Sequence, residues 1–530
     1  MDFLELYWTD VYKTGHVFML PPGSVRMVSN FTPRSGRLAN FDSPVGVISA
    51  GTQMMVSKMK DDWDRNFFSR PIEEIDQFGK DMTDMLMLKE PFDVTHFKEL
   101  HKLGYLPLEI RALPEGTLIP YKVPMYVVWN TESVGNVAFD FLVNYLETIF
   151  SAESWQAPTS ATTAFEFVRR GRAAVLKTDP ENEWFLKYKY HDFSMRGMGG
   201  KSAIVNSGVG FAMVSHGSDT LPVIPATRKW YGADKACINS VIATEHAIMC
   251  TLTGFFLRKN DGTWDKIGEL EVETFRYLLR RFPIGILSLV SDTWDLWRVI
   301  IDYCVVLKDE ILDRNGKLVI RPDSGDPVDI LCGLNTNQKY MDNADGERFV
   351  DTTKPEYKGV IELLYEIFGG TITSTGYKKL HEKIGAIYGD SINILRADQI
   401  DERMMSKGFA TTNYVLGVGS YSLQYVTRDT HGFAQKATYV EIDMGNGPEG
   451  IEIFKDPITD SGVKKSARGL IAVNLDENDG YVLKDQATWD DVLSDSNCML
   501  PIFKDGSLMN SVDFDTIRGR VDDLLKRCND

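Results

Sequence analysis

The sequence lacks several features that would point to other classes of protein. It has only six cysteines among 530 residues and no Cys-x-x-Cys pair, so neither a zinc site of paired cysteines nor a disulfide scaffold is indicated. No apolar run approaches the ~20 residues needed to span a bilayer, and the opening MDFLELYWTD has no basic segment of the kind that begins a secretory signal. We therefore expect a soluble protein of the reducing cytoplasm.

The chain also lacks an excess of positive charge. Its 58 Lys and Arg residues are outnumbered by 75 Asp and Glu residues, which gives a formal net charge of -17. The surface as a whole repels polyanions, so we expect no nucleic-acid partner, and any phosphate needs a local pocket. Hydrophobic residues make up 43% of the chain and charged residues 25%, as in globular proteins, and the length suffices for two or more domains.

Four stretches of the chain share one design: a short apolar run, a cluster of Asp, Ser, Gly or Arg, and then an amphipathic segment. Apolar runs bounded by turn residues predict buried strands, and the segments that follow them have helical spacing. Repeated strand-turn-helix units predict a parallel α/β barrel, in which the polar clusters at the strand ends should converge. The stretches are GILSLVSDTWD at 285–295, LVIRPDSGDP at 318–327, GAIYGDSIN at 385–393 and YVLGVGS at 414–420.

The segments on either side of this barrel predict a second, discontinuous α+β domain. Residues 1–180 mix strand-like and helical pieces, and residues 181–425 carry the barrel strands and the active site. Residues 426–530 return to alternating strands, which we expect to rejoin the amino-terminal portion. Two polar inserts, at 335–356 and 458–469, are expected to be surface loops because Asn, Asp and Gly favour turns.

Single residues in these clusters suit phosphate chemistry, although each has a purely structural alternative. The turn at 417–420 can offer backbone N–H groups to a phosphate, but a glycine turn after a strand often only reverses the chain. Asp323 and Asp326 can hold a divalent cation, or Arg321 and an aspartate can close the loop by an ion pair. His246 can act as a base or phosphoryl acceptor, or it can be a structural histidine.

Several short motifs occur in an order that is more specific than any one of them. This order resembles that of the nicotinamide phosphoribosyltransferases and extends over residues 7 to 470, approximately. Relatives that use nicotinate usually lack the HDFxxRG and xEH forms, so the match favours the amide-specific branch. The motifs are HDFSMRGMGG at 191–200, HGSDT at 216–220, ATEH at 243–246, SDTWD at 291–295, IRPDSGDP at 320–327, GDSIN at 389–393, LGVGS at 416–420, TRD at 427–429 and FKDP at 454–457.

The resemblance implies a type II phosphoribosyltransferase, with an irregular α/β barrel beside an α+β domain and two active sites at a homodimer interface. In this family, nicotinamide and 5-phosphoribosyl 1-pyrophosphate react with magnesium to give nicotinamide mononucleotide and pyrophosphate in NAD salvage. Family members also hydrolyse ATP through a phosphohistidine that matches His246. The implied cofactor is therefore Mg2+, and ATP is the implied co-substrate.

By the same resemblance, the pyridine ring stacks on Phe193 and, from the other subunit, on Tyr12. Asp219 accepts a hydrogen bond from the carboxamide NH2, which nicotinate cannot supply, and is the expected specificity determinant. Arg196 and Arg321 match positions that hold substrate phosphate or the amide oxygen.

The remaining expected residues contact the sugar and the phosphates. Asp323 and Asp390 are the carboxylate candidates for ribose, magnesium or ring contacts, and His246, Asp323 and Asp219 form the expected catalytic set. The chain departs from the family pattern at Ser420, where glycine is usual, and at Asn393, where Asp is common. By the resemblance, Gly389, Gly419 and Ser420 line the 5-phosphate pocket through backbone N–H groups, and Ser240 also contacts substrate. Phosphate or ATP contacts are expected from Arg34, Arg428, Lys436 and Lys455.

Two alternatives stay open. The first is a nicotinate-specific enzyme, which is favoured if Asp219 lies away from the ring site. The second is a catalytically inactive homologue that only binds ligands. The intact set of Phe193, Arg196, Asp219 and His246 argues against such decay.

Overall fold

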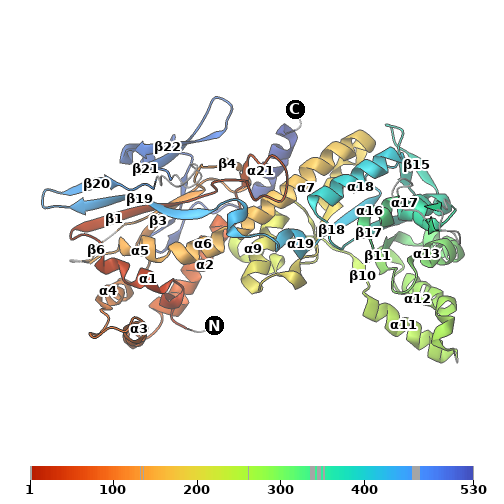
Figure 1. The fold of residues 1–530 in the computed structure, drawn as a ribbon, viewed down its shortest axis with the longest axis horizontal. Helices are drawn as coiled ribbons and strands as arrows, with labels where there is room; N and C mark the ends of the chain where they lie inside the picture. Colours follow the sequence, from red (N-terminus) through yellow and green to blue (C-terminus); the bar gives the residue numbers. More distant parts are fainter. Residues whose placement is uncertain are drawn as a thin grey trace.

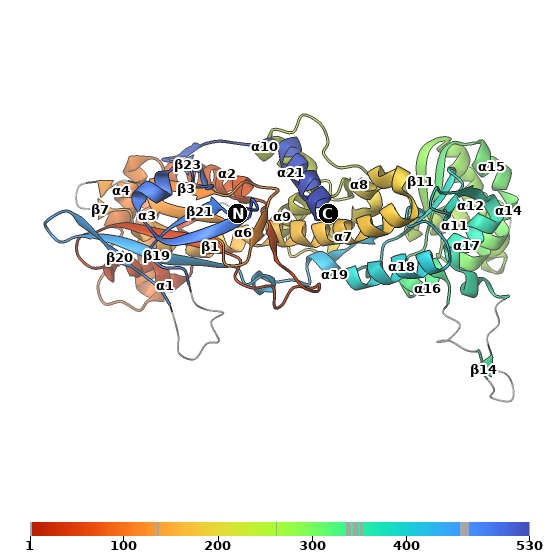
Figure 2. The ribbon, with the colours of Figure 1, turned by 90° about the horizontal axis from the view of Figure 1, so that it is seen from above.

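The computed structural model describes residues 3–131, 133–134, 137–260, 262–334, 341–342, 348–349, 353–455 and 466–528. A parallel sheet lies at one end of an elongated molecule and an antiparallel sheet at the other (Figures 1 and 2). Most of the inserts at 335–356 and 458–469 fall outside the described residues. In the described ranges, no helix combines the length and apolarity needed to cross a bilayer.

A curled sheet of seven parallel strands forms the barrel. The apolar runs predicted to be buried strands form β11, β12, β17 and β18, so that prediction is confirmed. A parallel bridge between Gly217 and Asn239, just before β10, links the two edges of the sheet. The order is β10 (Ile242–Ala243), β11 (Ile284–Val290), β12 (Asn315–Arg321), β17 (Ile384–Tyr388), β18 (Tyr414–Val418), β8 (Tyr190–Asp192) and β9 (Gly217–Ser218).

Helices connect successive barrel strands, as parallel pairing requires. Together with these helices, the apolar residues of β11, β12, β17 and β18 form one buried core. The predicted helical run at 294–307 forms α13 (Leu296–Arg298), a π-helical turn (Val299–Tyr303) and α14 (Cys304–Val306). The other main helices are α7 (Gln156–Thr178), α9 (Lys201–Ala212), α11 (His246–Lys259), α12 (Ile267–Arg281), α16 (Pro327–Cys332), α17 (Pro355–Phe368) and α18 (Ile394–Ser406).

The antiparallel sheet combines strands from both ends of the chain (Figure 1). β1 pairs with β5 on one side and with β19 on the other, so segments some four hundred residues apart in sequence are neighbours. The boundaries at 180 and 425 stay predictions. The order is β20 (Pro448–Glu452), β19 (Ala434–Asp443), β1 (Ser24–Thr32), β5 (Tyr126–Asn130), β3 (Leu108–Ala112), β23 (Leu500–Lys504) and β24 (Ser507–Leu508).

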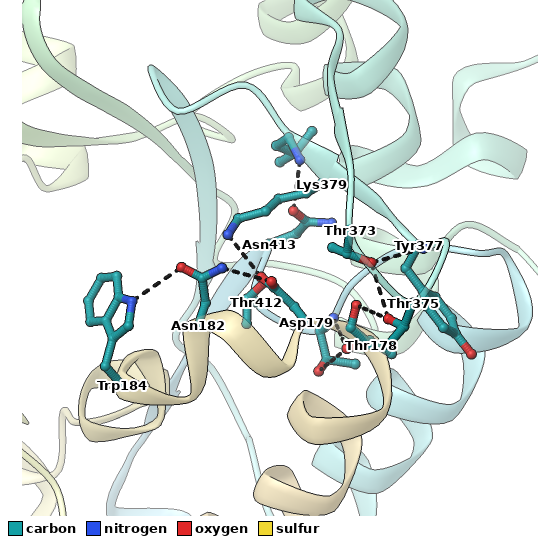
Figure 3. Close-up of polar contacts among 12 residues, drawn as sticks. Thr178, Asp179, Asn182, Trp184, Thr373, Thr375, Tyr377, Lys379, Thr412 and Asn413 are labelled. Atoms are coloured by element: carbon teal, nitrogen blue, oxygen red, sulfur yellow. Dashed lines mark hydrogen bonds and ion pairs between the residues drawn. The ribbon is translucent and has the colours of Figure 1, made fainter.

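A polar network joins three segments at the amino-terminal side of the barrel strands (Figure 3). The buried carboxylate of Asp179, just after α7, accepts hydrogen bonds from Thr412 at 2.5 Å and Asn182 at 2.7 Å, and it lies 2.9 Å from Lys379 Nζ. Thr412 precedes β18, and Lys379 belongs to the strand Lys378–Leu380. Burial favours the neutral acid, but the hydrogen bonds outweigh it and lower the pKa of Asp179.

We expect Asp179→Ala to reduce the free energy of unfolding by about 2–4 kcal/mol, because three donors lose a buried acceptor. Urea unfolding at pH 7 measures this loss, and Asp485→Ala, at an exposed position, should change stability by less than about 0.5 kcal/mol. Because the folded pKa lies below the unfolded value of about 3.9, the contribution is present above that pH and is lost as the pH falls through the folded pKa. An unchanged urea midpoint at pH 7 would contradict this role.

Candidate functional site

The polar clusters meet at the carboxyl ends of the parallel strands, as the sequence predicts. The parallel register sets Val290 beside Arg321, Tyr388 beside Leu416, and Val418 beside Asp192. The residues that follow each strand therefore lie along one edge of the sheet. Contacts described below bring together Phe193, Asp219, Ser240, His246, Arg321, Asp323, Gly389 and Gly417.

Phe193 lies against two glycines on neighbouring strands. A Cβ atom on Gly417 would lie 2.2 Å from Phe193 Cδ2, and one on Gly389 would lie 2.8 Å from Phe193 Cε2. The guanidinium carbon of Arg321 is 5.4 Å from the Phe193 ring centroid, within cation–π range. The ring of His191 is 4.9 Å from it. Only glycine at 389 and 417 leaves room for the ring in this position.

Asp219 is held through one of its two carboxylate oxygens. His191 Nε2 lies 3.1 Å from Oδ1, and the hydroxyl of Ser240 donates to the same oxygen. Burial favours the neutral acid, but these hydrogen bonds and the charge of Arg321 lower the pKa of Asp219, so the carboxylate is ionised at neutral pH. Within the described ranges, Oδ2 has no hydrogen-bond donor. An ionised acceptor is therefore available close to Phe193.

His246 begins α11 and faces two carboxylates. Its Nε2 lies 3.9 Å from Asp292 Oδ1 and 4.0 Å from Asp323 Oδ2, and its Nδ1 lies 3.2 Å from Thr293 Oγ1. Asp292 Oδ2 accepts hydrogen bonds from the Asp323 backbone at 2.8 Å and from Ser324 at 2.6 Å. Its Oδ1 is buried with no hydrogen-bond partner among the described residues, and His246 Nε2 faces this oxygen from 3.9 Å.

The turn at 389–393 is bonded to the helix that follows the turn at 417–420. Ser422, in α19 (Ser420–Leu423), donates to the carbonyl of Ile392 at 2.7 Å. In the part of the chain described, the backbone N–H groups of Asp390 and Gly419 donate to no protein acceptor. Free N–H groups on adjoining turns are suited to an anion.

The two departures from the family pattern have structural explanations. Asn393 is the N-cap of α18, and its side chain accepts a hydrogen bond from the backbone of Arg396 at 2.8 Å; Asn and Asp cap helices about equally well. The hydroxyl of Ser420 lies over Gly197, where an added Cβ would be 2.0 Å from it. The glycine in the 191–200 segment therefore accommodates the serine.

Asp323 could hold a magnesium ion shared with substrate, since its side chain is 35% exposed beside His246. Asp326 caps α16, because its Oδ1 accepts hydrogen bonds from the backbone N–H groups of Val328 at 3.0 Å and Asp329 at 3.2 Å. Its expected contact with a cation stays a prediction. Among the described residues, no group of three or more His, Cys, Asp and Glu side chains forms a ready metal site. A cation held through Asp323 would need oxygens from the substrate.

Three of the expected residues belong to elements outside the barrel sheet. Tyr12, in α1 (Val11–Thr14), is 59% exposed, and α1 and β18 lie in different halves of the molecule (Figure 1). Lys436 is in β19 and pairs with Glu147 at 3.0 Å, and Lys455 follows β20.

The expected arginines outside the strand ends are also placed by the structure. Arg34 Nε donates to the carbonyl of Gly432 at 2.8 Å. Arg428 begins the short helix Arg428–Thr430 just before that glycine, so the two cations belong to one region. Arg196 is exposed in the short helix Met195–Gly197 that follows Phe193.

His191 and Asp292 are site residues to which the sequence analysis gave no role. Both belong to motifs singled out there, HDFSMRG and SDTWD. The available signal was position: each is a polar residue at the end of a barrel strand.

Comparisons with known proteins place this geometry in a family. A model of the nicotinate phosphoribosyltransferase (NAPRTase) family matches residues 188–495. The chain is 40% identical to the nicotinamide phosphoribosyltransferase of Acinetobacter baylyi over 98% of this chain and 97% of that protein. The chain belongs to the nicotinate phosphoribosyltransferase family. It is therefore a phosphoribosyltransferase, a transferase of pentosyl groups.

Two further comparisons agree with this assignment. The nicotinamide phosphoribosyltransferase of Mycoplasma pneumoniae is 29% identical over 85% of this chain and 92% of that protein. The crystal structure of human nicotinic acid phosphoribosyltransferase shares the fold, with a TM-score of 0.55 at 13% identity, covering 98% of this chain and 94% of that one. The predicted type II phosphoribosyltransferase fold is confirmed.

We expect Gly417→Ala to reduce phosphoribosyl transfer at least tenfold, because the new methyl group would overlap Phe193 and displace its ring. Gly385→Ala is the matched control on the neighbouring strand β17, where the added Cβ would be 3.4 Å from its nearest neighbour, Lys317 Cδ. Steady-state rates of both variants test the claim. Wild-type activity in Gly417→Ala would show that the position of Phe193 is unimportant.

Proposed function

We propose that this enzyme transfers the phosphoribosyl group of 5-phosphoribosyl 1-pyrophosphate to nicotinamide, giving nicotinamide mononucleotide and pyrophosphate in NAD salvage. The observation that carries the choice of base is Asp219, ionised and with Oδ2 open. The carboxamide NH2 of nicotinamide can donate to this oxygen, whereas the carboxylate of nicotinate would bring like charges together. The names of the relatives in Acinetobacter baylyi and Mycoplasma pneumoniae support the same base.

The base is held by stacking in this proposal. Phe193, fixed over Gly389 and Gly417, offers one ring face. The opposite face would be covered by the partner subunit's Tyr12 in a homodimer. Tyr12 is 59% exposed on α1, away from the barrel sheet (Figure 1), so its ring is accessible to a second chain, which supports this arrangement.

The transfer step breaks the bond between ribose C1 and the pyrophosphate oxygen while the ring nitrogen of nicotinamide bonds to C1. Positive charge develops on the ribose, and the carboxylates of Asp323 and Asp390 would stabilise it. Arg196 and Arg321 would hold phosphate or amide oxygens through their guanidinium groups. Magnesium, when bound, neutralises charge on the leaving pyrophosphate, and Asp323 would hold it together with pyrophosphate oxygens.

His246 is proposed to accept a phosphoryl group from ATP. A neutral imidazole is a competent nucleophile, and the side chain of His246 is 47% exposed, so a phosphate can reach it. The γ-phosphoryl group would leave ADP and bond to a ring nitrogen of His246, while Asp292 orients the ring from 3.9 Å. Phosphate and ATP contacts would come from Arg34, Arg428, Lys436 and Lys455, with the last two supplied across the dimer.

We expect Asp219→Asn to raise the ratio of kcat/KM for nicotinate to that for nicotinamide by about tenfold or more, because the substitution removes the like charge. The two rates are measured separately by chromatography of the products. Asp234→Asn, at an exposed position between β9 and β10, is the control and should leave the ratio unchanged. Unaltered selectivity in Asp219→Asn would contradict the role proposed for this carboxylate.

We expect His246→Ala to lose all acid-labile label from γ-phosphate-labelled ATP and all acceleration of transfer by ATP. His381→Ala serves as the control because that residue precedes β17, on the opposite side of the barrel, and should retain both properties. Retention of the label in His246→Ala would place the phosphoryl acceptor elsewhere.

A further inference from the structure

Arg396 contacts the 389–393 turn and the helix α19, which follows the 417–420 turn. It lies in the first helical turn of α18, and its Nη1 donates to the carbonyl of Ser391 at 2.5 Å. Its guanidinium carbon lies 6.0 Å from the ring centroid of Tyr421, which directly follows Ser420. One side chain therefore reaches the 389–393 turn and the start of α19.

The conformation of the first turn fixes where the guanidinium lies. Ser391 has φ of 50°, in the left-handed region that residues other than glycine seldom adopt. Its carbonyl is bonded to Arg396, and the next carbonyl, of Ile392, is bonded to Ser422. Both carbonyls are thus engaged by side chains, whereas the N–H group of Asp390 has no protein acceptor in the described ranges.

The charge of Arg396 is not neutralised by an ion pair with any described residue. Arg403, the other arginine of α18, instead forms an ion pair with Asp329 at 2.8 Å. A guanidinium has five N–H donors, and Arg396 uses one of them on a carbonyl. The remaining donors and the unpaired charge suit a phosphate, which guanidinium groups bind through short charge-assisted hydrogen bonds.

We propose that Arg396 binds the 5-phosphate group of the phosphoribosyl donor and of the mononucleotide product. This inference rests on the proposed function, since it takes the two turns to be the site of that phosphate. The backbone N–H groups supply hydrogen bonds but no net charge. Arg396 supplies the charge, and its contacts with the 389–393 turn and with α19 put it beside the expected position of the ribosyl phosphate. Nicotinamide and pyrophosphate should bind independently of it.

The test is isothermal titration of the full-length protein with ribose 5-phosphate, pyrophosphate and nicotinamide. We expect Arg396→Gln to weaken ribose 5-phosphate binding about ten- to hundredfold and to leave the other two affinities within about twofold. Arg396→Lys should weaken it less, because lysine keeps the charge but not the planar fork. Arg403→Gln is the matched control on the same helix and should bind all three ligands like the wild type.

Two results would overturn the proposal. The first is a ribose 5-phosphate affinity in folded Arg396→Gln within about twofold of the wild type. The second is an equal loss of affinity for all three ligands, together with a lower melting temperature, in both Arg396→Gln and Arg396→Lys. That result would show that the arginine only stabilises the fold. If the wild type forms no nicotinamide mononucleotide but Arg396→Gln still selectively loses ribose 5-phosphate, the proposed function fails and the role of Arg396 stands.

Discussion

Parallel pairing among β11, β12, β17, β18 and β8 is the constraint on which the site depends. It directs the carboxyl ends of the five strands to one edge, so that residues from Phe193 to Ser420 become neighbours although more than two hundred positions separate them. A parallel sheet needs a crossing helix between strands and burial on both faces. The same requirement explains the apolar strands, the long connections and the grouping of polar residues after each strand.

The two ends of this barrel differ in how fully their buried groups are packed and hydrogen-bonded. At the carboxyl ends, glycines at 389 and 417 leave space for Phe193, and Asp292 has a buried oxygen without a hydrogen-bond partner among the described residues. Such arrangements reduce stability and are typical of functional sites. At the amino-terminal side, Asp179 satisfies donors from three segments (Figure 3). Tight bonding away from the site helps to hold strands whose other ends bind ligands.

Much of this could be predicted from the sequence, because strand-forming runs and turn residues are local signals. These signals predicted the barrel strands and the return of the chain end to an α+β part. Together with the order of the motifs, they also predicted that Asp219, His246 and Asp323 converge. The contacts of His191 and Ser240 with the same carboxylate oxygen of Asp219 could not be predicted, because they depend on how the sheet curls. The contact between Arg396 and Tyr421 could not be predicted either, because it depends on the side-chain geometry of two separate segments.

The most direct test of the central claim is a competition for the phosphoribosyl group. The purified wild-type protein is incubated with magnesium, 5-phosphoribosyl 1-pyrophosphate and equal concentrations of nicotinamide and nicotinate, and the two mononucleotides are separated. The account predicts that nicotinamide mononucleotide dominates, because ionised Asp219 favours the carboxamide. Dominant nicotinate mononucleotide, or no product from either base, would contradict it.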